Sequence, residues 1–283
     1  MRYLIAAFIA SLLLFSCEKD ITLDLQEKER KIVVESYVEQ GLPPVVLISS
    51  DISLYDNVDT TSLKGYGLKA DKVEISDGVN SFVLNEISYH GFTGYTSLIM
   101  KGEIGKHYKL TITMGSRVLY GYTTIPVPVK LDSVKFRPNR DTSRYGVLRL
   151  HFRDPDTLGN CYKYFTKRLG RDKDFVTGNF SLIEDKFING KEFFIDIRRA
   201  SLLDDQDTVE VPQERGYYRN GDTVVVKWCS IDRAHYNFWR SAAQSNGANG
   251  NPFATPVTVK SNITGGIGLW GGYGAFYDTV VVK

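Results

Sequence analysis

Cysteine is scarce in this sequence, with three among 283 residues, and the four histidines are scattered along the chain. No CxxC pair and no cluster of Cys with His occurs, so no metal site is predicted. The sequence also lacks a GxSxG elbow, an HExxH pair, a Walker loop and a dinucleotide fingerprint. We therefore predict no catalytic residues and no cofactor, and we expect a protein that is not an enzyme.

A strong charge of either sign is also absent. The chain has 35 Lys and Arg against 33 Asp and Glu, which gives a formal net charge of +2. Proteins that bind nucleic acids normally present a strongly basic surface. We therefore expect no nucleic-acid partner, and the balance gives no preference between charged and neutral ligands.

The one long apolar run lies at the N-terminus. Arg2 precedes a run from Leu4 to Phe15, which is shorter than the roughly 20 residues of a membrane-spanning helix but suits a signal peptide. The sequence Leu-Phe-Ser-Cys, ending at Cys17, forms a lipobox. We expect removal of residues 1–16 and lipidation of Cys17. An ordinary signal peptide that happens to contain this cysteine is the alternative.

Lipid on Cys17 decides how firmly the chain is held. Two or more acyl chains, such as palmitate, give stable membrane anchoring, whereas one gives marginal binding. The polar and charged residues 17–30 are then a flexible tether.

The rest of the chain is rich in short β-type segments. Runs of Val, Ile, Tyr, Phe and Thr recur between Gly, Asn and Asp, which predicts an all-β fold. About seven such runs occur in residues 31–126, a density typical of an immunoglobulin-like sandwich. Two of the turns, Asp77-Gly78 and Gly115-Ser116, have residues that favour tight hairpins.

Alternating prolines at 126 and 128 interrupt the strand pattern and mark the predicted domain boundary. Residues 129–283 are predicted to be a larger β-sandwich or partly closed barrel, in which Asn189-Gly190 joins two strands. One helix is expected over 231–245, with Ser230 as N-cap, because apolar residues recur there at helical spacing. A last pair of strands, 256–260 and 275–282, brackets a glycine-rich loop.

The glycine-rich loop contains three aromatic residues, Trp270, Tyr273 and Phe276. Their rings are candidate contacts for a sugar or peptide ligand. Alternatively, the glycines let a strand bend where another backbone passes close to it.

Two further features have alternative interpretations. Cys161 and Cys229 lie in predicted strands of the same half of the chain and form either a disulfide or two buried thiols. The segment 154–160 has carboxylates at the spacing of a calcium loop, but Asp-Pro and Gly-Asn are also ordinary turn formers.

The C-terminal third has the most specific pattern in the chain. Asn-Pro-Phe at 251–253 and Asn-Ile at 262–263 precede the glycine-rich run 265–273. Together with Ile-Pro at 125–126 and Phe-Arg-Asp-Pro at 152–155, this pattern resembles the Bacteroidota lipoprotein family called Domain of Unknown Function 4249. The resemblance covers nearly the whole chain after the lipobox. It implies an outer-membrane lipoprotein encoded beside a TonB-dependent receptor, and it implies no catalytic residues.

We therefore expect a non-enzymatic accessory or ligand-binding component of a TonB-dependent nutrient uptake system. The membrane, a TonB-dependent receptor and a small nutrient, glycan or peptide are the expected partners. The cell surface is the expected side of the outer membrane, rather than the periplasm. A surface adhesion or display module is the alternative, and an unrecognised hydrolase comes third, because it would need convergent carboxylates or a Ser/His pair in a pocket.

Overall fold

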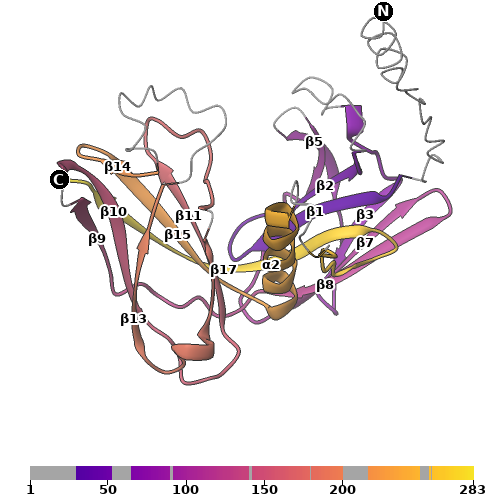
Figure 1. Ribbon diagram of the computed structural model, residues 1–283. Helices are drawn as coiled ribbons and strands as arrows, with labels where there is room; N and C mark the ends of the chain where they lie inside the picture. Colours follow the sequence, from indigo (N-terminus) through magenta and orange to yellow (C-terminus); the bar gives the residue numbers. More distant parts are fainter. Residues whose placement is uncertain are drawn as a thin grey trace, which may run out of the picture. The chain divides into compact units, whose positions relative to one another are not determined.

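The computed structural model describes residues 30–52, 65–89, 92–139, 142–178, 180–199, 216–248, 255 and 257–283. Within them the chain is all-β with one α-helix and no closed barrel (Figure 1), as the sequence predicts. The predicted signal peptide, the predicted lipidation site Cys17, nearly all of the predicted tether and the triplet at 251–253 lie outside the described residues.

The largest sheet has eight strands and contains both early and late parts of the chain. In spatial order its strands are β12 Leu182–Glu184, β11 Cys161–Arg168, β15 Thr223–Ile231, β17 Ile267–Val281, β1 Ile32–Glu39, β2 Val45–Ser50, β6 Phe92–Thr96 and β5 Asn85–Tyr89.

Two smaller sheets complete the described fold. The five-stranded sheet has the order β16 Ile263–Thr264, β8 Arg117–Thr124, β7 His107–Met114, β3 Lys72–Ser76 and β4 Ser81–Val83. The four-stranded sheet contains β13 Glu192–Ile197, β10 Thr142–Arg153, β14 Tyr218–Arg219 and β9 Ser133–Asn139. A 3-10 helix, Asp185–Phe187, and the α-helix α2, Arg233–Ala248, are the remaining elements.

Two apolar cores lie against the large sheet, one for each small sheet. The first core combines side chains of β1 and β2 with those of β3, β7 and β8. The second combines side chains of β11, β15 and β17 with those of β10. In β10 the predicted inward residues Leu148, Leu150 and Phe152 are all fully buried. The period-two pattern of that strand therefore faces a core, as expected for a sandwich.

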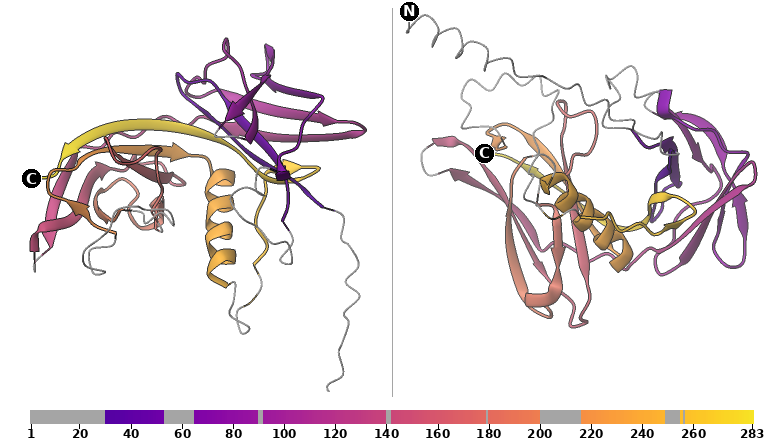
Figure 2. Two further views of the ribbon diagram at one scale, coloured as in Figure 1. Left: turned by 90° about the horizontal axis from the view of Figure 1, so that it is seen from above. Right: turned by 45° about the vertical axis from the view of Figure 1, so that its right-hand side comes forward.

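Strand β17 connects the two halves (Figures 1 and 2). Its first half pairs in parallel with β1, from Val33–Ile267 to Glu39–Tyr273. Its second half pairs antiparallel with β15, from Ser230–Gly274 to Thr223–Val281. The expected domain ranges 31–126 and 129–283 stay a prediction. In the structure, however, β16 and β17 of the second range pair with β8 and β1 of the first.

The expectation of a glycine-rich loop at 265–276 is wrong, because most of this segment is β17. Its glycines let other backbone segments cross the strand. A Cβ atom on Gly272 or Gly274 would overlap the carbonyl oxygen of Thr124 or Pro126, and one on Gly271 would lie 2.6 Å from the His235 ring. The close-approach interpretation of these glycines therefore fits the structure. Residues 257–260, predicted as a strand, have no regular structure.

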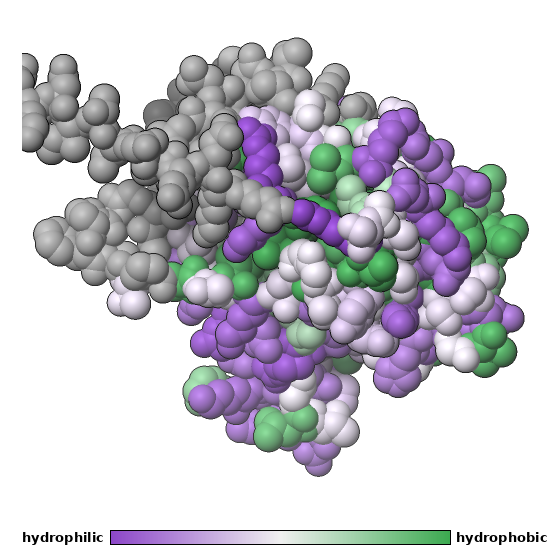
Figure 3. All heavy atoms as spheres, turned by 90° about the vertical axis from the view of Figure 1, so that its right-hand side faces the viewer, coloured by the Kyte–Doolittle hydropathy of each residue, from purple (hydrophilic) through white to green (hydrophobic). Residues whose placement is uncertain are grey.

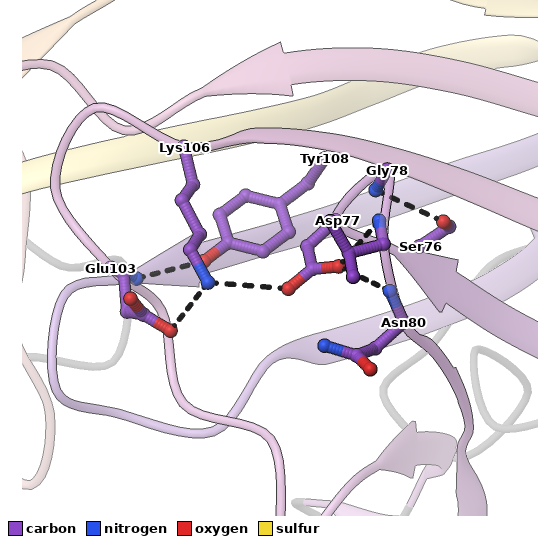
Figure 4. A network of polar contacts seen from close by, with 8 residues as sticks. Ser76, Asp77, Gly78, Asn80, Glu103, Lys106 and Tyr108 are labelled. Carbon is purple, nitrogen blue, oxygen red and sulfur yellow. Dashed lines mark hydrogen bonds and ion pairs between the residues drawn. The ribbon is translucent and has the colours of Figure 1, made fainter.

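Two predicted hairpins are present. Gly115-Ser116 joins β7 to β8 as a two-residue turn, and Gly115 has a φ of +56°. At the other hairpin, the Asp77 carboxylate accepts hydrogen bonds from the backbone N–H groups of Val79 and Asn80 and from Lys106 (Figure 4). These bonds lower the pKa of Asp77 to about 2.

Asn189-Gly190 lies between β12 and β13 and so joins two strands, as predicted, but these strands do not pair with each other. Strand β12 pairs with β11 of the large sheet, whereas β13 pairs with β10 of the four-stranded sheet. The turn therefore links two sheets. The 3-10 helix between β12 and the turn provides the change of direction.

The helix begins two residues later than predicted and ends three residues later, at Ala248. Ser230 is not its N-cap, because β15 continues through Ile231 in register with β11. Asp232 takes that role, since its carboxylate accepts a hydrogen bond of 2.8 Å from the N–H of His235. Within the described residues, no helix has the length and apolar character needed to cross a membrane.

Candidate functional site

The three aromatic residues proposed as ligand contacts do not share a surface. Trp270 is fully buried in the first core, where its Nε1–H donates to the Tyr108 carbonyl oxygen over 3.1 Å. Phe276 packs against the second core. Tyr273 lies in a third cluster beneath α2. The structure thus places them in three different packing environments along β17.

The two cysteines are free thiols, and both are buried. Cys161 lies opposite Ile231, and Cys229 lies opposite Lys163, so the cysteines are diagonal neighbours on β11 and β15. Burial raises the pKa of each thiol. Of the two interpretations of this pair, the structure has the unbridged one.

The segment 154–160 is a turn held by protein donors. The Asp154 carboxylate accepts hydrogen bonds from the Tyr162 hydroxyl and from the Gly190 N–H. The Asp185 carboxylate accepts from the N–H groups of Gly159 and Asn160. Within the described ranges, no group of three or more His, Cys, Asp or Glu residues is arranged to hold a metal ion.

One face of the large sheet carries an unexpected set of polar and aromatic side chains next to α2. The helix packs against β11, β12 and β17. In the register of the sheet, Phe165 lies opposite Lys227, Lys227 opposite Tyr277, and Glu39 opposite Tyr273. These strands therefore bring two lysines, Lys163 and Lys227, onto the face that the helix partly covers.

Lys227 is enclosed by its own protein. Its Nζ lies 2.5 Å from Glu39 Oε2, and the Tyr277 hydroxyl donates to the other carboxylate oxygen. The rings of Phe165, Phe175, Tyr273 and Tyr277 have their centroids 5.0–5.9 Å from the same ammonium. Because Lys227 fills this ring cage, the cage is closed to a second cation.

The outer rings of this cage are accessible to solvent. Phe175 and Tyr277 are 36% and 42% exposed and meet edge to face, with centroids 5.9 Å apart. They come from different segments, since Phe175 follows β11 and Tyr277 belongs to β17. Paired exposed rings of this kind offer apolar faces to a ligand.

Lys163 is the second lysine and is almost completely buried, with 2% exposure. Its Nζ lies 4.4 Å from the Trp239 ring of α2 and 5.2 Å from Phe165. It donates to the hydroxyl oxygens of Thr177 and Ser181 over 3.1 and 3.2 Å. Burial lowers its pKa to about 8.

A cleft of about 620 Å³ opens beside the start of α2. Its walls are the proline segment 126–129, the turn 155–162 and the segment 230–233. At its rim Arg233, 45% exposed, donates to Glu184 over 2.9 Å and to the Gly159 carbonyl oxygen over 3.2 Å. The cleft therefore combines apolar proline and valine surface with a few polar groups, as small-ligand sites do.

Sequence reasoning did not identify Lys163, Lys227 or Glu39. The available signal was the sequence Lys-Tyr-Phe-Thr-Lys at 163–167, which places both lysines on one face of the strand together with Phe165. It gave no sign that a helix covers the polar face.

The surface shown in Figure 3 has hydrophobic groups scattered between hydrophilic ones. Across the described residues, exposed apolar side chains occur in loops, such as Val79 and Leu98, and on strands, such as Val118. Isolated exposed apolar residues are ordinary, so we assign no site to them.

A family model described as Domain of unknown function (DUF4249) matches residues 18–276 of the chain. No curated protein matches the chain.

Proposed function

Since the chain belongs to the DUF4249 family, whose description assigns no activity, we propose a function from its residues: a lipid-anchored accessory protein of an outer-membrane TonB-dependent uptake system that binds a small nutrient. The lipobox at Cys17 supports the anchor. The lack of a recognised catalytic motif supports binding over catalysis. The receptor as partner rests on the family resemblance.

The cleft beside α2 is the observation that carries the ligand-binding part of this proposal. Its volume of about 620 Å³ falls within the range of roughly 300–1,000 Å³ found for small-molecule sites. The exposed rings of Phe175 and Tyr277 do not line the cleft but offer a separate apolar surface for a sugar or peptide.

Filling the cleft tests ligand binding. Val127 lines it and is 70% exposed, so Val127→Trp adds bulk there without disturbing a core. Val79→Trp, at a position 90% exposed in a hairpin turn, is the matched control. Calorimetric titration with neutral oligosaccharides and short peptides should detect binding to the wild type and the control, with loss in Val127→Trp. Equal binding by all three proteins would contradict the assignment of the cleft.

The partner requires a separate experiment. Affinity isolation of the lipoprotein from detergent-solubilised outer membrane should recover a TonB-dependent receptor, and a Cys17→Ala form should leave the membrane fraction. Recovery of no such receptor would count against the transport role. If deletion of the gene abolished attachment of the cells to surfaces but left their growth on every nutrient intact, the adhesion alternative would replace the transport role.

A further inference from the structure

Lys163 lacks the counter-charge that a buried lysine normally has. Lysines are rarely buried unless they are paired, and the other sheet lysine, Lys227, follows this rule with Glu39. No carboxylate among the described residues pairs with Lys163, whose polar contacts are the hydroxyls of Thr177 and Ser181. The opposite residue on β15 is the thiol of Cys229. A buried amine without an acid partner is a feature of functional sites.

The two hydroxyls and the amine form a closed triangle. Thr177 Oγ1 lies 2.6 Å from Ser181 Oγ, and Lys163 Nζ lies 3.1 and 3.2 Å from these two oxygens. Trp239 and Phe165 pack around the amine. The Lys163 amine thus has a fixed position next to the Ser181 hydroxyl, at the separation that proton transfer between a nucleophile and its base requires.

The surroundings shift the amine toward its neutral form, which is the form that accepts a proton. Burial lowers the pKa of Lys163 to about 8, so its uncharged fraction is larger than that of an exposed lysine and grows as the pH rises toward 8. A carboxylate would raise this pKa, and none of the described residues provides one at hydrogen-bonding distance. Serine hydrolases that use lysine as the base depend on the same condition.

We propose that Ser181 and Lys163 form a serine–lysine acyl-transfer centre that cleaves small carboxylic esters. Ser181 Oγ bonds to the acyl carbon while its proton passes to Lys163 Nζ. That proton then goes to the alkoxide that leaves as the ester C–O bond breaks. Water attacks the acyl group on Ser181 and gives a proton to Lys163, which returns it to Ser181 Oγ as the carboxylic acid departs.

Access limits the substrates to short acyl groups. Ser181 is only 4% exposed, whereas its neighbours Thr177 and Phe180 lie at the surface. Because Ser181 is nearly buried beside the exposed Thr177, we expect only small acyl groups to reach it. Acetyl esters are therefore the substrates to test. This activity is independent of the nutrient-binding role proposed for the cleft.

The test uses two small probes on the full-length lipoprotein in detergent. Diisopropyl fluorophosphate should attach to Ser181, as mapped by peptide mass spectrometry, and p-nitrophenyl acetate should be hydrolysed. Ser181→Ala should abolish both reactions. Lys163→Met should slow both by about 100-fold, the lower range of general-base effects.

Matched controls separate this role from a structural one. Lys167→Met removes a lysine of the same strand whose ammonium, among the described residues, donates to the Lys173 carbonyl oxygen. Ser36→Ala removes another buried serine. Both variants should react like the wild type. The proposal is overturned if the folded wild type takes up no label at Ser181, or if Lys163→Met and Lys163→Arg are labelled at the wild-type rate.

Discussion

The ion pair between Glu39 and Lys227 allows a quantitative prediction, because both side chains are largely buried. Glu39 is 2% exposed, and the Lys227 side chain is 12% exposed. Removing one partner of such a buried pair leaves the other charge unpaired, at a cost of about 3–5 kcal/mol. We expect Lys227→Met to lower the free energy of unfolding by about 3 kcal/mol, toward the lower end of that range, because the Tyr277 hydroxyl still donates to Glu39.

The double variant determines whether the charge pair itself is responsible. In Glu39→Gln with Lys227→Met no buried charge remains, and replacing both members of a buried pair is often close to neutral. The double variant should therefore be more stable than Lys227→Met alone, which gives a coupling energy of about 2 kcal/mol. Urea unfolding at pH 7, followed by tryptophan fluorescence, measures all four proteins.

An exposed ion pair provides the control. Lys69 and Glu86 meet at 2.7 Å, but their side chains are 71% and 47% exposed. Lys69→Met should leave the free energy of unfolding nearly unchanged, because solvent screens an exposed pair. If Lys227→Met were equally mild, or if the two substitutions at the buried pair were simply additive, the argument from burial would fail.

Three further predictions concern the backbone and the turns. Gly272→Ala should destabilise the protein strongly and lower its melting temperature, because the new Cβ would overlap the Thr124 carbonyl oxygen. Gly105→Ala is the comparison and should lower the melting temperature less, because Gly105 has a positive φ but open space around its Cα. Asp232→Ala should cost at least about 1 kcal/mol, because it removes the N-cap of α2 and the acceptor for the Thr123 hydroxyl and the Thr124 N–H. An unchanged urea midpoint would refute this. The pKa of Asp77 is lowered to about 2 in the folded state, so its carboxylate stabilises the fold above pH 4, and this stability is lost as the pH falls toward 2. Melting curves of the wild type and Asp77→Asn should therefore converge over that interval, and a constant gap would contradict the assignment.

The strands and short turns could be predicted because their signals are local. Alternation in β10 and the Gly115-Ser116 pair specify a half-buried strand and a two-residue hairpin without reference to the rest of the chain. The same local reasoning failed for β17. Its glycines have weak strand propensity, and its extended state depends on pairing with β1 and β15.

The polar face beside α2 was missed for a related reason. A strand with Lys163 and Lys167 two positions from Phe165 matches a strand with a solvent-facing side. Burial of Lys163 depends on Trp239, which belongs to a helix more than 60 residues later. Sequence pattern fixes which side chains share a face, but not which later element covers that face.

Strand β17 has a consequence for how the newly made chain acquires its structure. The partner of β1 is synthesised more than 230 residues after β1 itself, and until then the large sheet has an open edge beside Val33–Glu39. Such distant pairings slow folding, and an unpaired strand edge invites association with other chains. A nascent chain should therefore depend on chaperones for longer than two independent sandwiches would. Its two halves should gain protease resistance together, once β17 has been synthesised and has paired.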